Sequence, residues 1–362
     1  MNFKIDNQIL NLENLEKNNF EIKSHPKDYG VSINNERPLV VFEGLYRDGD
    51  VVLVDKKLMN LHQFFMLPET VKIYPIVAIE KNKTIETCLE LVSFLSENGF
   101  NKANTLHVIG GGIIQDIGSF TSAIYKRGID WILYPSTLLS MCDSCIGGKN
   151  GINFKGTKNQ LALFSSPKQV VICTKFIDTL EDREIKSGLG EILKLVSMGG
   201  KSMMENYCSL VKNGSVKNTD MYIDLIRDSL CVKKQVIEED EFELTIRKSL
   251  NYGHTIGHAL EVMSGHEIPH GEAVAIGMLL VNKMYKFDLD LLNQACYDII
   301  DKDRIKNLDT SNLRQLILKD KKTFGNKTTF IALKDYGETV FIDEIVDDKL
   351  IENILFEIQS VS

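Results

Sequence analysis

Residues 105–118 read TLHVIGGGIIQDIG and join a short apolar run to a glycine-rich turn. Thr105 to Ile109 has the length and composition of a buried strand, and the three glycines after it are typical of a turn leading into a helix. Glycines at such a turn let the backbone approach a diphosphate, which the amino end of the helix also attracts. The stretch is not the G-x-G-x-x-G fingerprint, and glycine runs also occur in ordinary tight turns, so both interpretations stay open here.

The segments around this turn alternate between strand and helix patterns. Two apolar runs, Val51–Val54 and Val71–Ile79, predict strands, and apolar residues between 85 and 95 recur at helical spacing. Such alternation predicts a mostly parallel sheet with helices on both faces. The helical spacing is carried by Ile85, Cys88, Leu89, Val92 and Leu95.

From about residue 178 onward the pattern changes. Apolar positions recur mainly at intervals of three and four, as in Ile223, Ile226 and Leu230, and strands are scarce until Thr328–Leu333. We therefore expect an α/β, Rossmann-like dinucleotide-binding domain over residues 1–175 and a mainly α-helical domain over residues 176–362.

Composition narrows the class of protein. The chain has 362 residues, of which 43% are hydrophobic and 25% charged, as in globular proteins. The net charge of −8 argues against nucleic acid and acidic membranes as partners. The first residues lack the features of a signal peptide, and seven scattered cysteines do not form a disulfide framework. We expect a cytoplasmic protein.

Basic residues nevertheless gather in the glycine-rich and histidine-rich stretches. In an acidic protein, such a distribution favours the binding of a small, multiply anionic ligand. The alternative for each residue taken alone is a solvated surface charge. The basic residues concerned are Arg127, Lys149, Lys158, Lys194, Lys233 and Arg247.

Residues 247–272, RKSLNYGHTIGHALEVMSGHEIPHGE, contain four of the seven histidines. His254 and His258 are four residues apart, so on a helix they would share one face and could present two nitrogens to one metal ion. His270 opens the next apolar helix and could point to the same place, whereas His266 is expected at the surface. A lone histidine is more often a surface or capping residue, but this spacing favours metal binding.

Other candidate residues lie in nearby motifs. Glu191 and Lys194 are one helical turn apart; they could be a surface ion pair, but the apolar neighbours of Glu191 predict a buried face that needs a cation. Asp55, Glu80 and Lys83 follow strands and could hold an adenosine ribose. The Cys142 and Cys145 pair is expected to pack around Asp143, because one C-x-x-C pair is weak evidence for zinc or redox chemistry.

Taken together, these motifs resemble those of the 3-dehydroquinate synthases, which belong to the sugar-phosphate cyclases. The resemblance covers roughly Asp55 to Phe330, and its specificity comes from the order and spacing of several motifs. These motifs are the GGGxxxD turn at 110–116, YKRG at 125–128, the segment 143–149, GExxK at 190–194, Lys233 before Asp240 and Glu241, and the segment 247–272.

The resemblance implies particular roles for these residues. The metal ligands would be Glu191, His254 and His270, while His258 would contact substrate and carry protons. One of Lys321 and Lys322 would be a late substrate-binding lysine. The other substrate contacts would be Arg127, Asp143, Lys149, Asn159, Lys194, Lys233, Arg247 and Asn251, and the NAD contacts would be Asp55, Glu80, Lys83, Gly111, Gly112, Ile113, Asp116, Ser136, Thr137, Lys149, Lys158, Phe176 and Thr179.

The implied reaction converts 3-deoxy-D-arabino-heptulosonate 7-phosphate to 3-dehydroquinate and phosphate in the shikimate pathway. It would use NAD and one divalent metal, usually zinc with cobalt as the alternative, for transient oxidation, phosphate elimination, re-reduction and aldol closure. A homodimer is also implied. Three alternatives are an inosose- or valiolone-forming cyclase, a polyol oxidoreductase of the glycerol dehydrogenase type, and a catalytically silent NAD-binding scaffold. Arg247 and Asn251 favour the dehydroquinate reaction.

Overall fold

The computed structural model describes residues 2–12, 15, 18–25, 27–213, 219–306, 308–319 and 323–361. The chain divides into two compact units. The first, here called the sheet unit, comprises Leu15–Leu180 and Lys217–Arg227, and the second, the helical unit, comprises Met1–Asn14, Glu181–Val216 and Asp228–Ser362. Lys321 and Lys322, one of which is expected to bind substrate, lie outside the described residues.

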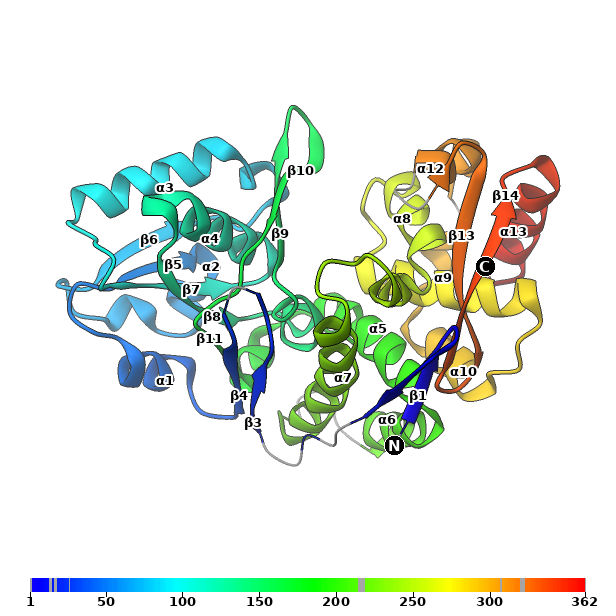
Figure 1. Cartoon of the computed structure of the whole chain (residues 1–362), viewed down its shortest axis with the longest axis horizontal. Helices are drawn as coiled ribbons and strands as arrows, with labels where there is room; N and C mark the ends of the chain where they lie inside the picture. Colours follow the sequence, from blue (N-terminus) through cyan, green and yellow to red (C-terminus); the bar gives the residue numbers. More distant parts are fainter. Residues whose placement is uncertain are drawn as a thin grey trace. The chain divides into compact units, whose positions relative to one another are not determined.

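The sheet unit is built on a seven-stranded sheet in the order β3-β4-β11-β8-β7-β5-β6 (Figure 1). Only β3 runs antiparallel to its neighbour, and all six residues of β7 are buried, as expected of a strand covered on both faces. The expected α/β fold is thereby confirmed. The strands are β3 (Asn19–Ile22), β4 (Tyr29–Asn34), β5 (Val51–Asp55), β6 (Lys72–Ile76), β7 (Thr105–Gly110), β8 (Asp130–Pro135) and β11 (Gln169–Cys173).

The predicted strand at Val71–Ile79 is too long. β6 ends at Ile76 because Val77 turns the chain: its carbonyl accepts the backbone N–H of Ile79 at 2.9 Å and the side-chain amide of Asn82 at 2.8 Å. A 3₁₀ turn, η2 (Glu80–Asn82), follows. The predicted helix over 85–95 is confirmed as α3 (Ile85–Glu97), whose N-cap Thr84 accepts from the backbone N–H of Thr87.

Further helices of this unit are α1 (Pro38–Leu45), α2 (Lys56–Leu61) and α4 (Gly112–Ile124). Gly118 lets α4 lie close to β7, since a Cβ at Gly118 would come within 2.6 Å of a methyl group of Val108. A two-stranded hairpin, β9 (Lys149–Phe154) with β10 (Thr157–Phe164), is separate from the main sheet. The short helical turns are η3 (Tyr125–Arg127), η4 (Ser140–Ser144), which is a π-helix, and η5 (Thr174–Thr179).

The helical unit confirms the mainly helical second half but contains more strands than the sequence indicated. The predicted strand at Thr328–Leu333 is part of β13 (Lys327–Asp335), in a five-stranded sheet of order β12-β13-β14-β1-β2. β1 pairs with β14 in parallel, with Lys4 opposite Glu338, so the sheet joins the two ends of the described chain. The other strands are β1 (Asn2–Ile5), β2 (Gln8–Asn11), β12 (Thr323–Phe324) and β14 (Glu338–Ile345).

Helices make up the rest of this unit. The helix α9 (His270–Tyr285) is buried continuously from Gly271 to Asn282, which makes it the central element of the core. None of the described helices is both long and apolar enough to cross a membrane. The helices are α5 (Asp182–Gly199), α6 (Lys201–Asn213), α7 (Thr219–Glu239, which begins in the sheet unit), η6 (Ile246–Asn251), α8 (His254–Met263), α9, α10 (Asp290–Ile299), α11 (Lys302–Lys306), α12 (Leu313–Lys319) and α13 (Asp348–Val361).

Glycines bring α5, α9 and the start of α8 into backbone contact. A Cβ at Gly190 of α5 would lie 2.0 Å from the carbonyl oxygen of Gly271 in α9. A Cβ at Gly277, two turns further along α9, would lie 1.9 Å from the carbonyl oxygen of Gly253, the N-cap of α8. No side chain fits at these points, so glycine sets the separation of the three helices.

Gly277→Ala tests this packing. We expect it to lower the free energy of unfolding by about 3 kcal/mol, because the new methyl group meets backbone that cannot rotate away. Chemical denaturation measures the change. The matched control is Gly44→Ala in α1, where a Cβ meets nothing within 4 Å; there stability should change by less than about 1 kcal/mol. Equal effects of the two substitutions would contradict the proposed packing.

Candidate metal and substrate site

A buried ion pair lies at the centre of α5. Glu191 and Lys194 are 0% and 1% exposed, and the Lys194 ammonium contacts a carboxylate oxygen of Glu191. Burial by itself would raise the pKa of Glu191, but the Lys194 charge and His270 together hold it below its ordinary value. The carboxylate is therefore ionised, and the surface ion pair considered from the sequence is excluded.

Two histidines face this carboxylate from the first residues of α8 and α9. Nε2 of His270 lies 3.2 Å from Oε1 of Glu191, and Nε2 of His254 lies 3.5 Å from the same oxygen. One ligand atom from each of the three residues lies within 4.8 Å of the other two. Each of these residues is next to one of the glycines of the helix contacts, namely Gly190, Gly253 and Gly271. The backbone contacts thus determine how close the three side chains come.

The second ring nitrogen of each histidine is also engaged. Nδ1 of His254 lies 3.1 Å from the backbone carbonyl oxygen of Tyr252, and Nδ1 of His270 lies 3.1 Å from Oε2 of Glu261. When those nitrogens donate, both Nε2 atoms are left as acceptors, which together with Glu191 could bind one metal ion. Sequence reasoning missed Glu261, although its position on α8, seven residues after His254, predicts the same helix face.

His258 has a different environment from His254. It is exposed, whereas His254 is buried, and their ring centroids are 5.3 Å apart. Among the described residues, no group with metal-ligand spacing contains both of them. His258 instead forms such a group with Glu261 and His270. His266 is exposed in the loop between the helices, as expected.

The donor set fits a divalent cation. Neither carboxylate oxygen of the fully buried Glu191 has a hydrogen-bond partner of acceptable geometry among the described residues. An ionised carboxylate without such partners is costly in a protein interior unless a cation compensates it. Lys194 supplies one charge, and a metal held by one carboxylate oxygen and two imidazole nitrogens would supply the rest.

A tight turn after α7 positions the predicted substrate residues of this unit. The Asp240 carboxylate accepts from the backbone N–H groups of Leu244, Thr245 and Arg247 at 2.9, 2.7 and 3.0 Å. Arg247 is 2% exposed, and its guanidinium donates to the backbone carbonyl of Glu241.

Asn251 and Lys233 are two further predicted substrate residues of this unit. The Asn251 side-chain amide donates to Glu243 at 3.0 Å and to the carbonyl of Lys248 at 3.1 Å. Lys233 on α7 is buried as well, at 6% exposure. Sequence reasoning missed the part played by Glu243, because only the structure brings it beside Asn251.

In the sheet unit, most of the predicted NAD residues lie at the carboxyl ends of strands, where ligands bind to α/β sheets. Gly111 caps α4 directly after β7, and a Cβ at Gly111 would lie 2.9 Å from Thr137, which follows β8. The amino end of α4 therefore lies close to the residues after β8. Asp55 ends β5, Glu80 and Lys83 follow β6, and Phe176 and Thr179 follow β11 in η5; Gly112, Ile113 and Asp116 belong to the first turns of α4, and Ser136 follows β8.

The predicted substrate residues of the sheet unit are not all at this edge. Asp143 is in η4 after β8, Lys149 begins β9, and Asn159 is in β10 beside Lys158, a predicted NAD contact. Arg127 lies between the end of α4 and the start of β8, which places it at the amino edge of the parallel sheet. The fold of this unit thus separates Arg127 from the strand ends that carry the other candidates.

Comparison with known proteins identifies the family. The sequence model of the 3-dehydroquinate synthase N-terminal domain matches residues 73–187, and that of the C-terminal domain matches residues 188–323. The 3-dehydroquinate synthase of Clostridium tetani is 34% identical over 341 residues, which cover 91% of this chain and 87% of the relative. That of Parabacteroides distasonis is 36% identical over 349 residues, which cover 93% and 95%.

Solved structures of other cyclases share the fold. A 2-deoxy-scyllo-inosose synthase complexed with carbaglucose-6-phosphate, NAD+ and Co2+ has a TM-score of 0.75 at 20% identity and covers 93% of this chain and 99% of its own. The 2-epi-5-epi-valiolone synthase of Streptomyces hygroscopicus, with NAD+ and Zn2+ bound, has a TM-score of 0.74 at 20% identity, with 95% and 100% covered. With both domain models and close relatives over most of its length in agreement, the chain belongs to the 3-dehydroquinate synthase family.

Proposed function

We propose that Glu191, His254 and His270 hold the divalent metal with which this enzyme converts 3-deoxy-D-arabino-heptulosonate 7-phosphate to 3-dehydroquinate and phosphate. The observation that carries the proposal is a fully buried, ionised carboxylate that faces two imidazole Nε2 atoms within 3.5 Å. When bound, the metal supplies Lewis-acid polarisation of a substrate hydroxyl, and NAD supplies a hydride acceptor that is restored within the turnover. Zinc suits two imidazoles and a carboxylate, so we propose zinc.

The cations of the helical unit would bind the phosphate and carboxylate of the substrate. Lys194, Lys233 and Arg247 are all at least nine-tenths buried, so their charges act in a medium of low dielectric constant. Because Arg247 and Asn251 are held by Asp240 and Glu243, they need little rearrangement when substrate binds. Buried ammonium and guanidinium groups bind anionic groups more strongly than neutral hydroxyl groups, which favours the phosphorylated acid over a neutral polyol.

His258 would carry protons. It is exposed, and its ring lies 6.1 Å from that of His270 in a stacked arrangement. An exposed imidazole can exchange protons with solvent, which suits a group that delivers or removes protons beside a metal site.

The sheet unit would bind NAD. Its glycine turn at the amino end of α4 offers backbone N–H groups to a diphosphate, and the residues at the ends of β5, β6, β8 and β11 surround that turn in the sheet order. We also propose that the enzyme is a cytoplasmic homodimer, as composition and family resemblance imply.

The reaction itself is the first test. We expect phosphate release from the heptulosonate to require NAD in catalytic amounts only and to stop when a chelator removes the metal, because the oxidation is reversed within each turnover. Phosphate and NADH are measured together. Activity with a chelator present, or one NADH formed for every phosphate, would contradict the proposed reaction.

Two histidine variants test the ligand assignment. We expect His270→Ala to lose the metal during dialysis, because it removes one of three protein ligands. His258→Ala should keep its metal and turn over at least about 100-fold more slowly, as expected when a general acid–base is lost. Metal content is measured by elemental analysis. The reverse result would assign the ligand to His258, in the group that it forms with Glu261 and His270.

Glu261→Gln tests the partner of His270. Loss of the carboxylate that orients the ring should weaken metal binding about 10-fold to 100-fold. Competition with a fluorescent chelator measures the affinity without any need for activity. Glu267→Gln, in the exposed loop before α9, is the matched control and should bind metal like the unmodified protein. An unchanged affinity in Glu261→Gln would show that the contact with His270 does not support the metal.

A further inference from the structure

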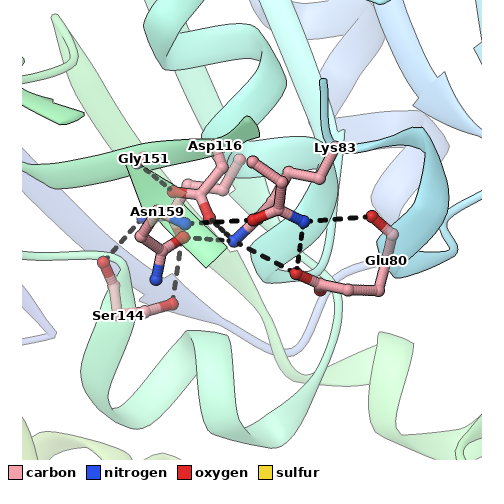
Figure 2. A network of polar contacts seen from close by, with 8 residues as sticks. Glu80, Lys83, Asp116, Ser144, Gly151 and Asn159 are labelled. Atoms are coloured by element: carbon pink, nitrogen blue, oxygen red, sulfur yellow. Dashed lines mark hydrogen bonds and ion pairs between the residues drawn. The ribbon is translucent and has the colours of Figure 1, made fainter. Parts of the chain in front are cut away.

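Lys83 is buried in the sheet unit, although the family resemblance makes it an NAD contact. Its side chain is 8% exposed, and its ammonium donates to Oδ2 of Asp116 at 3.0 Å and to Oδ1 of Asn159 at 2.7 Å (Figure 2). Glu80 adds a third oxygen at 3.8 Å. Oxygens from three separate segments thus surround one ammonium, and those of Asp116 and Asn159 accept from it.

This contact determines which way the Asn159 amide points. An ammonium group has only donors, so the amide must present its oxygen to Lys83. The NH₂ end of the amide is therefore turned away from Lys83. Asn159 itself is exposed, so a ligand can reach this side chain.

The backbone at Asn159 is fixed by the same cluster. Asn159 has a φ of 53°, in the left-handed region that asparagine tolerates better than most residues. Its N–H donates to Oδ1 of Asn153 at 3.0 Å, and the amide of Asn153 donates to Oε1 of Glu80 at 2.8 Å. The N–H of Asn153 donates to the backbone carbonyl of Lys83 at 2.8 Å. Both the position of Asn159 and the direction of its amide are therefore set.

Asp116 ties this arrangement to the glycine turn. Its second oxygen accepts from the backbone N–H of Gly151 at 3.2 Å, so the carboxylate joins α4 to the β9–β10 hairpin (Figure 2). A Cβ at Gly151 would lie 3.1 Å from Cβ of Asn159, which explains the absence of a side chain there. Lys83 thus contacts β10 through Asn159, and Asp116 contacts β9 through Gly151, so both strands of the hairpin are held.

We propose that Lys83 is a positioning residue that turns the NH₂ group of Asn159 toward the substrate, so that Asn159 binds an acceptor oxygen of a phosphate, carboxylate or carbonyl group. The proposal rests on the proposed function and on the family resemblance, which makes Asn159 a contact of the heptulosonate. It assigns Lys83 a role through Asn159 in addition to the NAD contact that the family resemblance implies.

A double-mutant cycle tests whether the effect of Lys83 on substrate binding depends on Asn159. We expect Lys83→Met and Asn159→Ala each to raise KM for the heptulosonate about 10-fold or more, and the double variant to be within about 3-fold of the worse single variant. The Kd for NAD, measured by titration, should change by less than about 3-fold in Asn159→Ala, because Asn159 is assigned to the substrate and not to NAD. Lys81→Met, an exposed residue in the same turn, is the control and should behave like the unmodified enzyme.

Asn159→Asp tests the orientation while leaving Lys83 in place. One carboxylate oxygen can still accept from Lys83, but the other replaces the NH₂ donor and repels an anionic substrate. We therefore expect a KM higher than that of Asn159→Ala by about 10-fold, a typical effect of opposing like charges. Thermal unfolding establishes that each variant is folded.

Three results would overturn the proposal. The first is a double variant in which the two losses multiply, and the second is a Lys83→Met enzyme with weakened NAD binding and an unchanged KM. The third is an Asn159→Asp enzyme as active as the unmodified one. Failure of the proposed function is distinguishable, because the unmodified enzyme would then release no phosphate from the heptulosonate.

Discussion

The helical unit depends on keeping one ionised carboxylate in a place that water does not reach. Glu191 is fully buried, and the helices around it approach so closely that glycine is required at their contacts. A carboxylate in such a place is unfavourable unless positive groups surround it. Lys194 provides one positive charge, and a metal held by His254 and His270 would provide the rest.

Close helix packing also limits how the site can vary. Wider spacing of α5, α8 and α9 would move the two imidazoles away from Glu191, and a metal tolerates only a few tenths of an ångström in its ligand distances. Small residues at Gly190, Gly271 and Gly277 are thus part of the proposed metal site, although none of them carries a functional group. The backbone contacts between the helices therefore determine the distances between the proposed metal ligands.

Local patterns in the sequence predicted the local elements well. The strand at 105–109, the glycine turn and the helix over 85–95 are present because strand length, turn residues and helical spacing act over a few neighbouring residues. The five-stranded sheet was mostly missed because β1 pairs with β14 from the other end of the chain, and no local pattern records such a pairing. Helical spacing alone grouped His254 with His258, since it cannot tell that one is buried and the other exposed. The Glu191, His254 and His270 grouping came from family resemblance, and the partners of the two histidines, the Tyr252 carbonyl and the Glu261 carboxylate, came only from the structure.

Partner groups that can only donate or only accept fix the direction of side chains within each unit. An ammonium can only donate and a backbone carbonyl can only accept, so a side chain paired with either has no freedom to reverse. The carbonyl of Tyr252 fixes one end of His254 in this way, and Lys83 fixes one end of Asn159. A neutral partner that could both donate and accept would leave two orientations of similar energy, and substrate binding would then have to select one of them. Since preorganised dipoles need no rearrangement during reaction, partners that allow one orientation are favoured where charge develops.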